Sequence, residues 1–174
     1  MAEGRLLLVI NPGSTSTKIA LFRDEQELSR ETLSHSAQEL AAFASVASQA
    51  DLRRAAVNGF LAEHGVLPTN LAAVVGRGGL LHPLSSGGTY AINADMLADL
   101  RAGRYGEHAS ALGSIIAAEI AESAGIPALT VDPVVVDEMA PEARLSGMPG
   151  NPRLSRFHCL NQRAAARTVA QRMG

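Results

Sequence analysis

The segment best suited to bind phosphate spans residues 11–18 and reads Asn-Pro-Gly-Ser-Thr-Ser-Thr-Lys. Gly13 lets a ligand approach the backbone closely, Ser14 and Ser16 supply hydroxyl groups, and Lys18 supplies a cation, which are the donors that phosphate oxygens need. The segment is not a Walker A loop, because threonine precedes the lysine and a strand is expected to follow. An ordinary hairpin turn is the alternative, and the turn alone does not decide between the two.

Arg77 lies between glycines, with Gly76 before it and two more after it. Because no neighbouring side chain crowds its guanidinium, a carboxylate or phosphoryl group can reach it through two parallel hydrogen bonds. Taken alone, the pattern is more typical of a solvated loop arginine.

Two histidines precede or open candidate helices, His108 near the start of 107–124 and His158 at the start of 158–173. The N-terminus of a helix attracts anions, so a histidine there can hydrogen-bond a phosphoryl group in transfer. The alternative for each is a histidine of a capping turn. Three others have no comparable setting and are expected to be structural or solvated: His35, His64 and His82.

Asp132 follows a buried strand and precedes Pro133. The carboxyl ends of strands in open α/β sheets face the ligand crevice, where a carboxylate can orient an arginine or a hydrated Mg²⁺. A helix or turn cap is the alternative, and it is the commoner use of aspartate at such a position.

Strands and helices mix along the chain around these residues. Short apolar patterns predict strands at 5–10, 18–23, 27–33, 71–75 and 128–131, and helical periodicity predicts helices at 37–50, 51–65, 93–102, 107–124 and 158–173. The first two strands flank the polar turn and form an antiparallel hairpin, so we expect an α/β fold with a mixed sheet. The glycine-rich loop at 76–89 is long enough to suggest a functional role.

Composition excludes several classes of protein. The 174 residues are 47% hydrophobic with a formal net charge of −2 and no tryptophan, so a nucleic-acid reader is not expected. The longest aliphatic run, 6–10, is far short of a membrane span, and the N-terminus carries no secretory pattern. With one cysteine there is no intrachain disulfide. We therefore expect a cytoplasmic protein without membrane or nucleic-acid partners.

Six motifs in order resemble the acetate/butyrate kinase family, in its butyrate branch. They cover essentially the whole chain and read VINPGSTSTKIALF, VVGRGGLLHPL, GGTYAIN, YGEHASALG, VDPVVVDE and RFHCLNQRAA. The resemblance implies the actin-like ATPase fold, in which two ribonuclease-H-like lobes close on ATP. The implied reaction, with Mg²⁺, is ATP plus a short-chain carboxylate giving ADP and an acyl phosphate.

The family's site residues carry over by motif. The phosphate loop would comprise Asn11, Gly13, Ser14, Ser16 and Lys18. Arg77 would bind the carboxylate and the transferring phosphoryl group, His108 and His158 would hydrogen-bond that group, and Asp132 with Asn11 would help to hold Mg²⁺. The substrate would be butyrate or a branched analogue, and the full-length protein a homo-oligomer.

Family members are much longer than this chain, and the later glycine-rich nucleotide segments have no counterpart in it. The resemblance therefore implies a first lobe at 1–137 without its C-terminal helix, a linker at 138–155, and the opening helix of a second lobe at 156–174. We expect little activity from such a chain alone. The alternatives are a non-catalytic remnant or binding module that keeps a phosphate or carboxylate site, and another kinase or ATPase of this fold, against which the contexts of Arg77, His108 and His158 argue.

Overall fold

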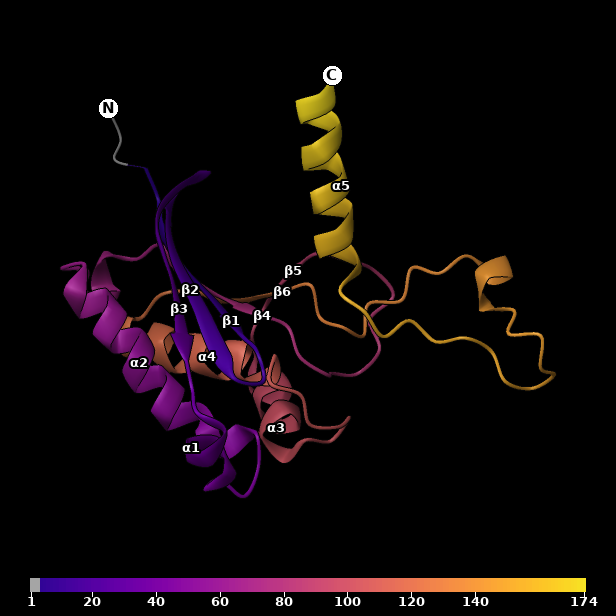
Figure 1. The fold of residues 1–174 in the computed structure, drawn as a ribbon, viewed down its shortest axis with the longest axis horizontal. Helices are drawn as coiled ribbons and strands as arrows, with labels where there is room; N and C mark the ends of the chain where they lie inside the picture. The colour runs from indigo at the N-terminus through magenta and orange to yellow at the C-terminus, as the bar shows by residue number, and fades with distance from the viewer. Residues whose placement is uncertain (1–3) are drawn as a thin grey trace.

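A computed structural model describes residues 4–174 and contains a six-stranded mixed sheet (Figure 1). Its strands are β1 (Leu6–Pro12), β2 (Ser16–Arg23), β3 (Gln26–Ser34), β4 (Ala73–Arg77), β5 (Thr89–Ala91) and β6 (Ala128–Val131). The order across the sheet is β3-β2-β1-β4-β6-β5. The first three strands are antiparallel, β1, β4 and β6 are parallel, and β5 is an antiparallel edge. The predicted α/β fold with a mixed sheet and an opening hairpin is confirmed.

The helices are α1 (Ala37–Ala41), α2 (Ala50–Glu63), α3 (Ala94–Ala102), α4 (Ala111–Ala124) and α5 (Cys159–Met173). The central one is α4, which packs on β4, β6 and β1. Its predicted apolar stripe is confirmed, since Leu112, Ile115, Ile116 and Ile120 are at most 3% exposed. In α2 the buried face differs from the predicted one: Arg53 and Val57 lie inside with Phe60 and Leu61, whereas Leu52 and Ala56 are only half-buried.

The single helix predicted at 37–50 is wrong. Helix α1 ends at Ala41, and a turn and the short 3₁₀ helix Ala47–Gln49 precede α2. Ser45 and Ser48 cause part of this break, because each side chain accepts a hydrogen bond from the other residue's backbone N–H. Serine side chains that bond the local backbone in this way compete with helical hydrogen bonding.

Other boundaries also differ from the prediction, among them β4, which runs Ala73–Arg77 rather than 71–75 and so takes Arg77 out of the predicted loop at 76–89. Strands β1 and β2 extend into the predicted polar turn and leave only residues 13–15 between them. Helix α4 begins at Ala111 rather than at residue 107, because Gly106 has a positive φ of 109° and Ser110 donates its N–H to His108. Strand β5 is not among the predicted strands, and only its first residue, Thr89, falls in the predicted loop; three residues carry too little pattern to predict a strand.

The start of α4 touches the end of β4 without intervening side chains. A Cβ atom at Gly113 would lie 2.7 Å from the carbonyl oxygen of Arg77 and 2.9 Å from its nitrogen, and a Cβ at Gly76 would overlap the Gly113 carbonyl. Glycine at both positions lets helix and strand approach backbone to backbone. This contact holds Arg77 close to the loop that carries His108.

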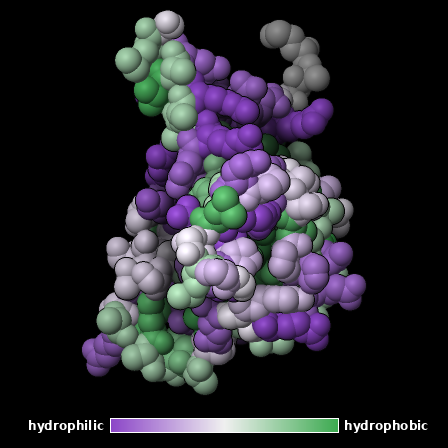
Figure 2. Space-filling model, turned by 90° about the vertical axis from the view of Figure 1, so that its right-hand side faces the viewer, coloured by the Kyte–Doolittle hydropathy of each residue, from purple (hydrophilic) through white to green (hydrophobic). Residues whose placement is uncertain are grey.

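The C-terminal part of the chain is much more exposed. Helix α5 stands apart from the α2–α4 layer (Figure 1), and none of its residues is buried. Large hydrophobic side chains are exposed here, among them Leu145, Met148, Leu154 and Met173, and the space-filling view of this side shows green patches among purple ones (Figure 2). Within residues 4–174, none of the helices combines the length and apolarity that a bilayer span requires. The lobe boundaries at 137 and 155 stay predictions.

Candidate functional site

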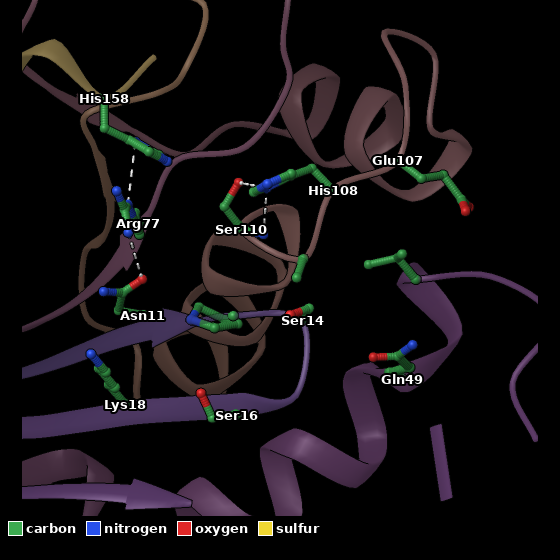
Figure 3. A pocket seen from close by; sticks show the side chains of 14 residues that line it. Asn11, Ser14, Ser16, Lys18, Gln49, Arg77, Glu107, His108, Ser110 and His158 are labelled. Carbon is green, nitrogen blue, oxygen red and sulfur yellow. Dashed lines mark hydrogen bonds between the residues drawn. The ribbon is translucent and has the colours of Figure 1, made fainter. Parts of the chain in front are cut away.

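Strand register lines up three polar residues at one end of the sheet. Asn11 on β1 pairs with Lys18 on β2, and because Ile10 pairs with Gly76, Asn11 also lies beside Arg77 on β4. Directly paired residues project from the same face of a sheet. Figure 3 shows Lys18, Asn11 and Arg77 in this row, with the hairpin turn on one side of it.

A cleft of about 560 Å³ opens over this row. It is lined by eight of the nine residues that the sequence nominated: Asn11, Gly13, Ser14, Ser16, Lys18, Arg77, His108 and His158. The ninth, Asp132, does not line it and instead borders a smaller hollow of about 350 Å³ next to α5. The fold thus brings together residues from widely separated parts of the chain.

Arg77 lies between the hairpin and the C-terminal segment. Its NH1 donates to Asn11 Oδ1 at 3.3 Å, and its Nε lies 3.2 Å from His158 Nδ1 (Figure 3). Burial lowers the pKa of Arg77, and the nearby Asp132 carboxylate acts in the opposite direction. Arginine remains protonated in proteins, so Arg77 gives the lining of the cleft a permanent cation.

His108 is oriented by the loop before α4. Its Nδ1 accepts the backbone N–H of Ser110 at 3.2 Å and lies 2.7 Å from Ser110 Oγ. A nitrogen that accepts a backbone N–H carries no proton, so the neutral ring must carry its proton on Nε2. His108 can therefore donate Nε2–H to an anion in the cleft.

His158 has the opposite arrangement. Its Nδ1 is 2.7 Å from the Asp132 backbone carbonyl, which can only accept, so Nδ1 carries the proton. The 3.2 Å approach of Arg77 Nε to the same nitrogen then cannot be a good hydrogen bond, and the shorter carbonyl contact decides the tautomer. Burial lowers the pKa of His158, as does Arg77, against the effect of the Asp132 hydrogen bond. The neutral ring has a lone pair on Nε2 and donates from there only when protonated.

Asp132 caps helix α5 from a left-handed backbone conformation, with φ of 54°. Its Oδ1 accepts the N–H of Leu160 at 3.0 Å, and its Oδ2 accepts the N–H of Asn161 at 3.2 Å. The carboxylate is 3.5 Å from His158 Nδ1, and the residue is only 5% exposed. Through these contacts Asp132 fixes both His158 and the start of α5.

Oxygen atoms that could bind Mg²⁺ are present, but each already accepts a hydrogen bond. Asn11 Oδ1 accepts from Arg77, and both Asp132 oxygens accept N–H groups of α5. Among the residues that the structure describes, no three acidic, histidine or cysteine side chains gather as a metal site. Mg²⁺ is commonly held by one or two carboxylates, waters and substrate phosphates, so the ion fits this cleft as a companion of bound phosphates. The predicted roles of Asn11 and Asp132 in binding it stay predictions.

Sequence reasoning missed several residues of the site. Glu107, Gln49 and Ser110 line the cleft, and Arg53 lies buried beneath the hairpin turn. The sequence indicates that Arg53 is buried, because Val57 and Phe60 follow it at spacings of four and seven residues and so lie on the same face of α2.

No protein-family model matches the chain. It is 54% identical over 168 residues to a probable butyrate kinase of Enterococcus faecalis, and 54% identical over 165 residues to butyrate kinase 2 of Clostridium acetobutylicum. The matches cover 97% and 95% of this chain but 46% of each relative. The chain therefore spans about half the length of the curated relatives it matches.

Solved structures of acetate kinases share the fold. The enzyme of Porphyromonas gingivalis matches with a TM-score of 0.60 at 16% identity, over 95% of this chain and 48% of that one. The enzyme of Entamoeba histolytica matches with a TM-score of 0.53 at 15% identity, over 95% and 46%. The predicted actin-like ATPase fold is confirmed.

Proposed function

The chain is a homologue of the butyrate kinases over nearly its whole length, and from this premise we propose that it forms part of a carboxylate kinase. The proposed reaction transfers the γ-phosphoryl group of ATP to a short-chain fatty acid, butyrate or a branched analogue, and yields an acyl phosphate. Mg²⁺ would accompany the nucleotide and neutralise phosphate charge. A cytoplasmic location and a homo-oligomeric state belong to the same proposal.

The observation that carries the proposal is the row of Lys18, Asn11 and Arg77 facing His108 and His158 across one cleft. Phosphoryl transfer asks a protein chiefly to position the reactants and to place cations and donors around the phosphoryl oxygens. A carboxylate substrate is already ionised at neutral pH and needs no general base. Cations and hydrogen-bond donors of the kind that this reaction requires line the cleft, which supports the proposal.

Each residue has a role that follows from its contacts. Lys18 and the hairpin turn bind phosphate oxygens. Asn11 accepts a hydrogen bond from NH1 of Arg77, and the other N–H groups of Arg77 bind the carboxylate and the transferring phosphoryl group. His108 donates Nε2–H to that group, and His158 does so once it is protonated.

A binding module without catalysis is the second candidate. It is favoured by one observation, that the chain spans about half the length of the butyrate kinases it matches. Such a module would bind nucleotide phosphates without turnover, so binding and catalysis must be measured separately.

Lys18 offers a direct test of binding, because it is the only lysine in the chain. We expect Mg-ATP to protect Lys18 from an amine-reactive reagent, with the α-amino group as internal control and peptide mass spectrometry as the readout. Arg77→Gln should weaken the protection, whereas the exposed Arg172→Gln should not. Unchanged labelling of Lys18 at saturating Mg-ATP would contradict the proposal.

Trapping acyl phosphate with hydroxylamine tests turnover. Hydroxamate formed from butyrate and ATP supports the kinase, whereas protection of Lys18 without hydroxamate supports the binding module. Comparing butyrate, isobutyrate and propionate addresses specificity, although one methylene in an apolar pocket changes binding by only about 1–3 kcal/mol.

A further inference from the structure

Arg53 is a fully buried arginine on α2, with 0% of its surface exposed. Its guanidinium lies directly beneath the hairpin turn that joins β1 and β2. NH1 donates to the carbonyl oxygens of Gly13 at 2.9 Å and Ser16 at 3.0 Å, and NH2 donates to that of Ser14 at 3.0 Å. Three carbonyls of one turn thus converge on a single side chain.

Two side chains complete the set of acceptors. NH1 also donates to Thr17 Oγ1 at 3.1 Å, and NH2 donates to Gln49 Oε1 at 3.0 Å. The Nε atom is buried and has no hydrogen-bond partner among the described residues. Arg53 therefore ties the turn to α2 across nearly forty residues of chain.

Every acceptor around Arg53 is neutral. Within residues 4–174, no carboxylate lies within the 4.0 Å ion-pair distance of its guanidinium. The next residue is a useful contrast, since Arg54 is 38% exposed and pairs with Asp51 and Glu119. Burying an unpaired charge is costly, and here the positive charge under the turn is offset only by neutral groups, three backbone carbonyls and the side chains of Thr17 and Gln49.

The carbonyl contacts also decide where the turn's N–H groups point. In a trans peptide the C=O and N–H are antiparallel. Because the carbonyls of Gly13 and Ser14 face Arg53, the N–H groups of Ser14 and Thr15 face away from it. Neither N–H has a hydrogen-bond acceptor in the described part of the chain. Two free donors therefore point outward above a buried cation, an arrangement that favours anions.

We propose that Arg53 is a positioning residue for phosphate binding: it holds the Gly13–Ser16 turn with its free N–H groups outward and supplies a positive charge that bound polyphosphate compensates. The ligand class is the polyphosphate of a nucleotide, and in this respect the inference rests on the proposed function. Arg53 itself touches no ligand. It acts through the turn above it and through its electric field.

The experiment uses inorganic tripolyphosphate as the probe and calorimetric affinity as the readout. We expect Arg53→Gln to weaken binding at least tenfold, because the variant removes the charge and most of the carbonyl contacts. Arg53→Lys keeps the charge but cannot span three carbonyls, so its affinity for tripolyphosphate should fall several-fold. Arg54→Gln, the adjacent arginine on the solvent side, is the matched control and should stay within twofold of the wild type.

Two further readouts separate positioning from a general structural role. The slope of log affinity against log salt should fall in Arg53→Gln but not in Arg53→Lys, because only the first variant removes a charge. Amide exchange without ligand should quicken relative to exchange in α4 in both Arg53 variants at the hydrogen-bonded amides of the turn, Gly13 N–H to the Ser16 carbonyl at 2.7 Å and His35 N–H to the Thr15 carbonyl at 2.8 Å. If Arg53→Gln does not fold, Arg53→Lys supplies the affinity and exchange comparisons.

The outcomes distinguish the two proposals. If the wild-type chain binds tripolyphosphate and a folded Arg53→Lys or Arg53→Gln variant binds it equally well, the inference is overturned and the proposed function stands. If the wild-type chain itself does not bind tripolyphosphate, the proposed function fails and the inference fails with it.

Discussion

The two walls of the cleft are held by different kinds of contact. The inner wall consists of the hairpin turn at 11–18, Arg77 and the loop at 107–110, and it rests on fully buried side chains such as Leu8, Ile10 and Leu112. The outer wall consists of His158, which immediately precedes α5, a helix in which no residue is buried. It is attached chiefly through polar contacts, from Asp132 to the start of α5 and from Arg163 to Glu138.

This difference has a physical consequence. Regions with few buried apolar contacts open at lower free energy than the core of the same protein. The inner wall should therefore keep its geometry with or without ligand, whereas the outer wall depends on a handful of hydrogen bonds. The hairpin side of the cleft is preorganised, and the position of His158 is the more easily changed.

The largest effect is expected where the inner wall rests on a backbone contact. Gly113→Ala places a methyl group 2.7 Å from the Arg77 carbonyl oxygen, and such overpacking costs about 1–3 kcal/mol. Gly59→Ala is the matched control, because nothing lies within 4 Å of a Cβ on that helical glycine, and it should stabilise the fold by about 0.5–1 kcal/mol. Urea denaturation measures both, and an unchanged midpoint for Gly113→Ala would contradict the close contact.

We expect Asp132→Ala to weaken the attachment of α5 to the rest of the protein. This variant removes the cap of α5, at a cost of about 0.5–2 kcal/mol, and places alanine at a φ of 54°. Asp132→Asn keeps an acceptor oxygen and tolerates that backbone conformation, so its effect should be smaller. Trypsin cleavage at Arg167 and Arg172 should quicken in the order wild type, Asn, Ala, while cleavage of the sheet at Arg23 stays constant. Equal rates for all three proteins would show that the cap does not hold α5.

The inner wall should be sensitive to acid through His35, which is 8% exposed and whose Nε2 lies 2.9 Å from Oγ1 of Thr17 on β2. Burial lowers the pKa of His35 below the ordinary 6.5, and the charge of Arg53 lowers it further, against a weaker effect of Glu39. Since the unfolded chain binds a proton at higher pH than the folded one, stability is full above about pH 6.5 and is lost as the pH falls towards the folded pKa, at about 1.4 kcal/mol per pKa unit. Melting temperatures between pH 7.5 and 5 should fall less steeply for His35→Gln than for the wild type or the exposed His82→Gln. Parallel slopes for all three would exclude His35 as the source.

The smallest effect is expected at the surface ion pair of the outer wall. Arg163 and Glu138 are 57% and 33% exposed, and exposed pairs contribute little to stability. Arg163→Ala should leave the global melting temperature unchanged, with at most a modest increase in trypsin cleavage at Arg167. A large drop in melting temperature would mean that the two walls are coupled more tightly than their contacts indicate.

The sequence alone was sufficient for much of the fold and for the chemical character of the site. The hairpin was predictable because apolar strand patterns flank an Asn-Pro-Gly turn, and α4 because Leu112, Ile115, Ile116 and Ile120 repeat at helical spacing. The segment at 11–18 contains the residue types that suit phosphate binding. Eight of the nine nominated residues line one cleft because strand ends and helix starts meet at the same edge of a sheet.

Only the tertiary structure decided how these residues are arranged. Strand register set Lys18, Asn11 and Arg77 in a row, and register depends on long-range pairing that local pattern does not encode. The tautomers of His108 and His158 follow from Ser110 and from the Asp132 carbonyl, partners that only the folded backbone supplies. Arg53 and Arg54 are identical in type and adjacent in sequence, yet a rotation of about 100° per residue around the helix buries the first under the turn and leaves the second partly exposed in ion pairs.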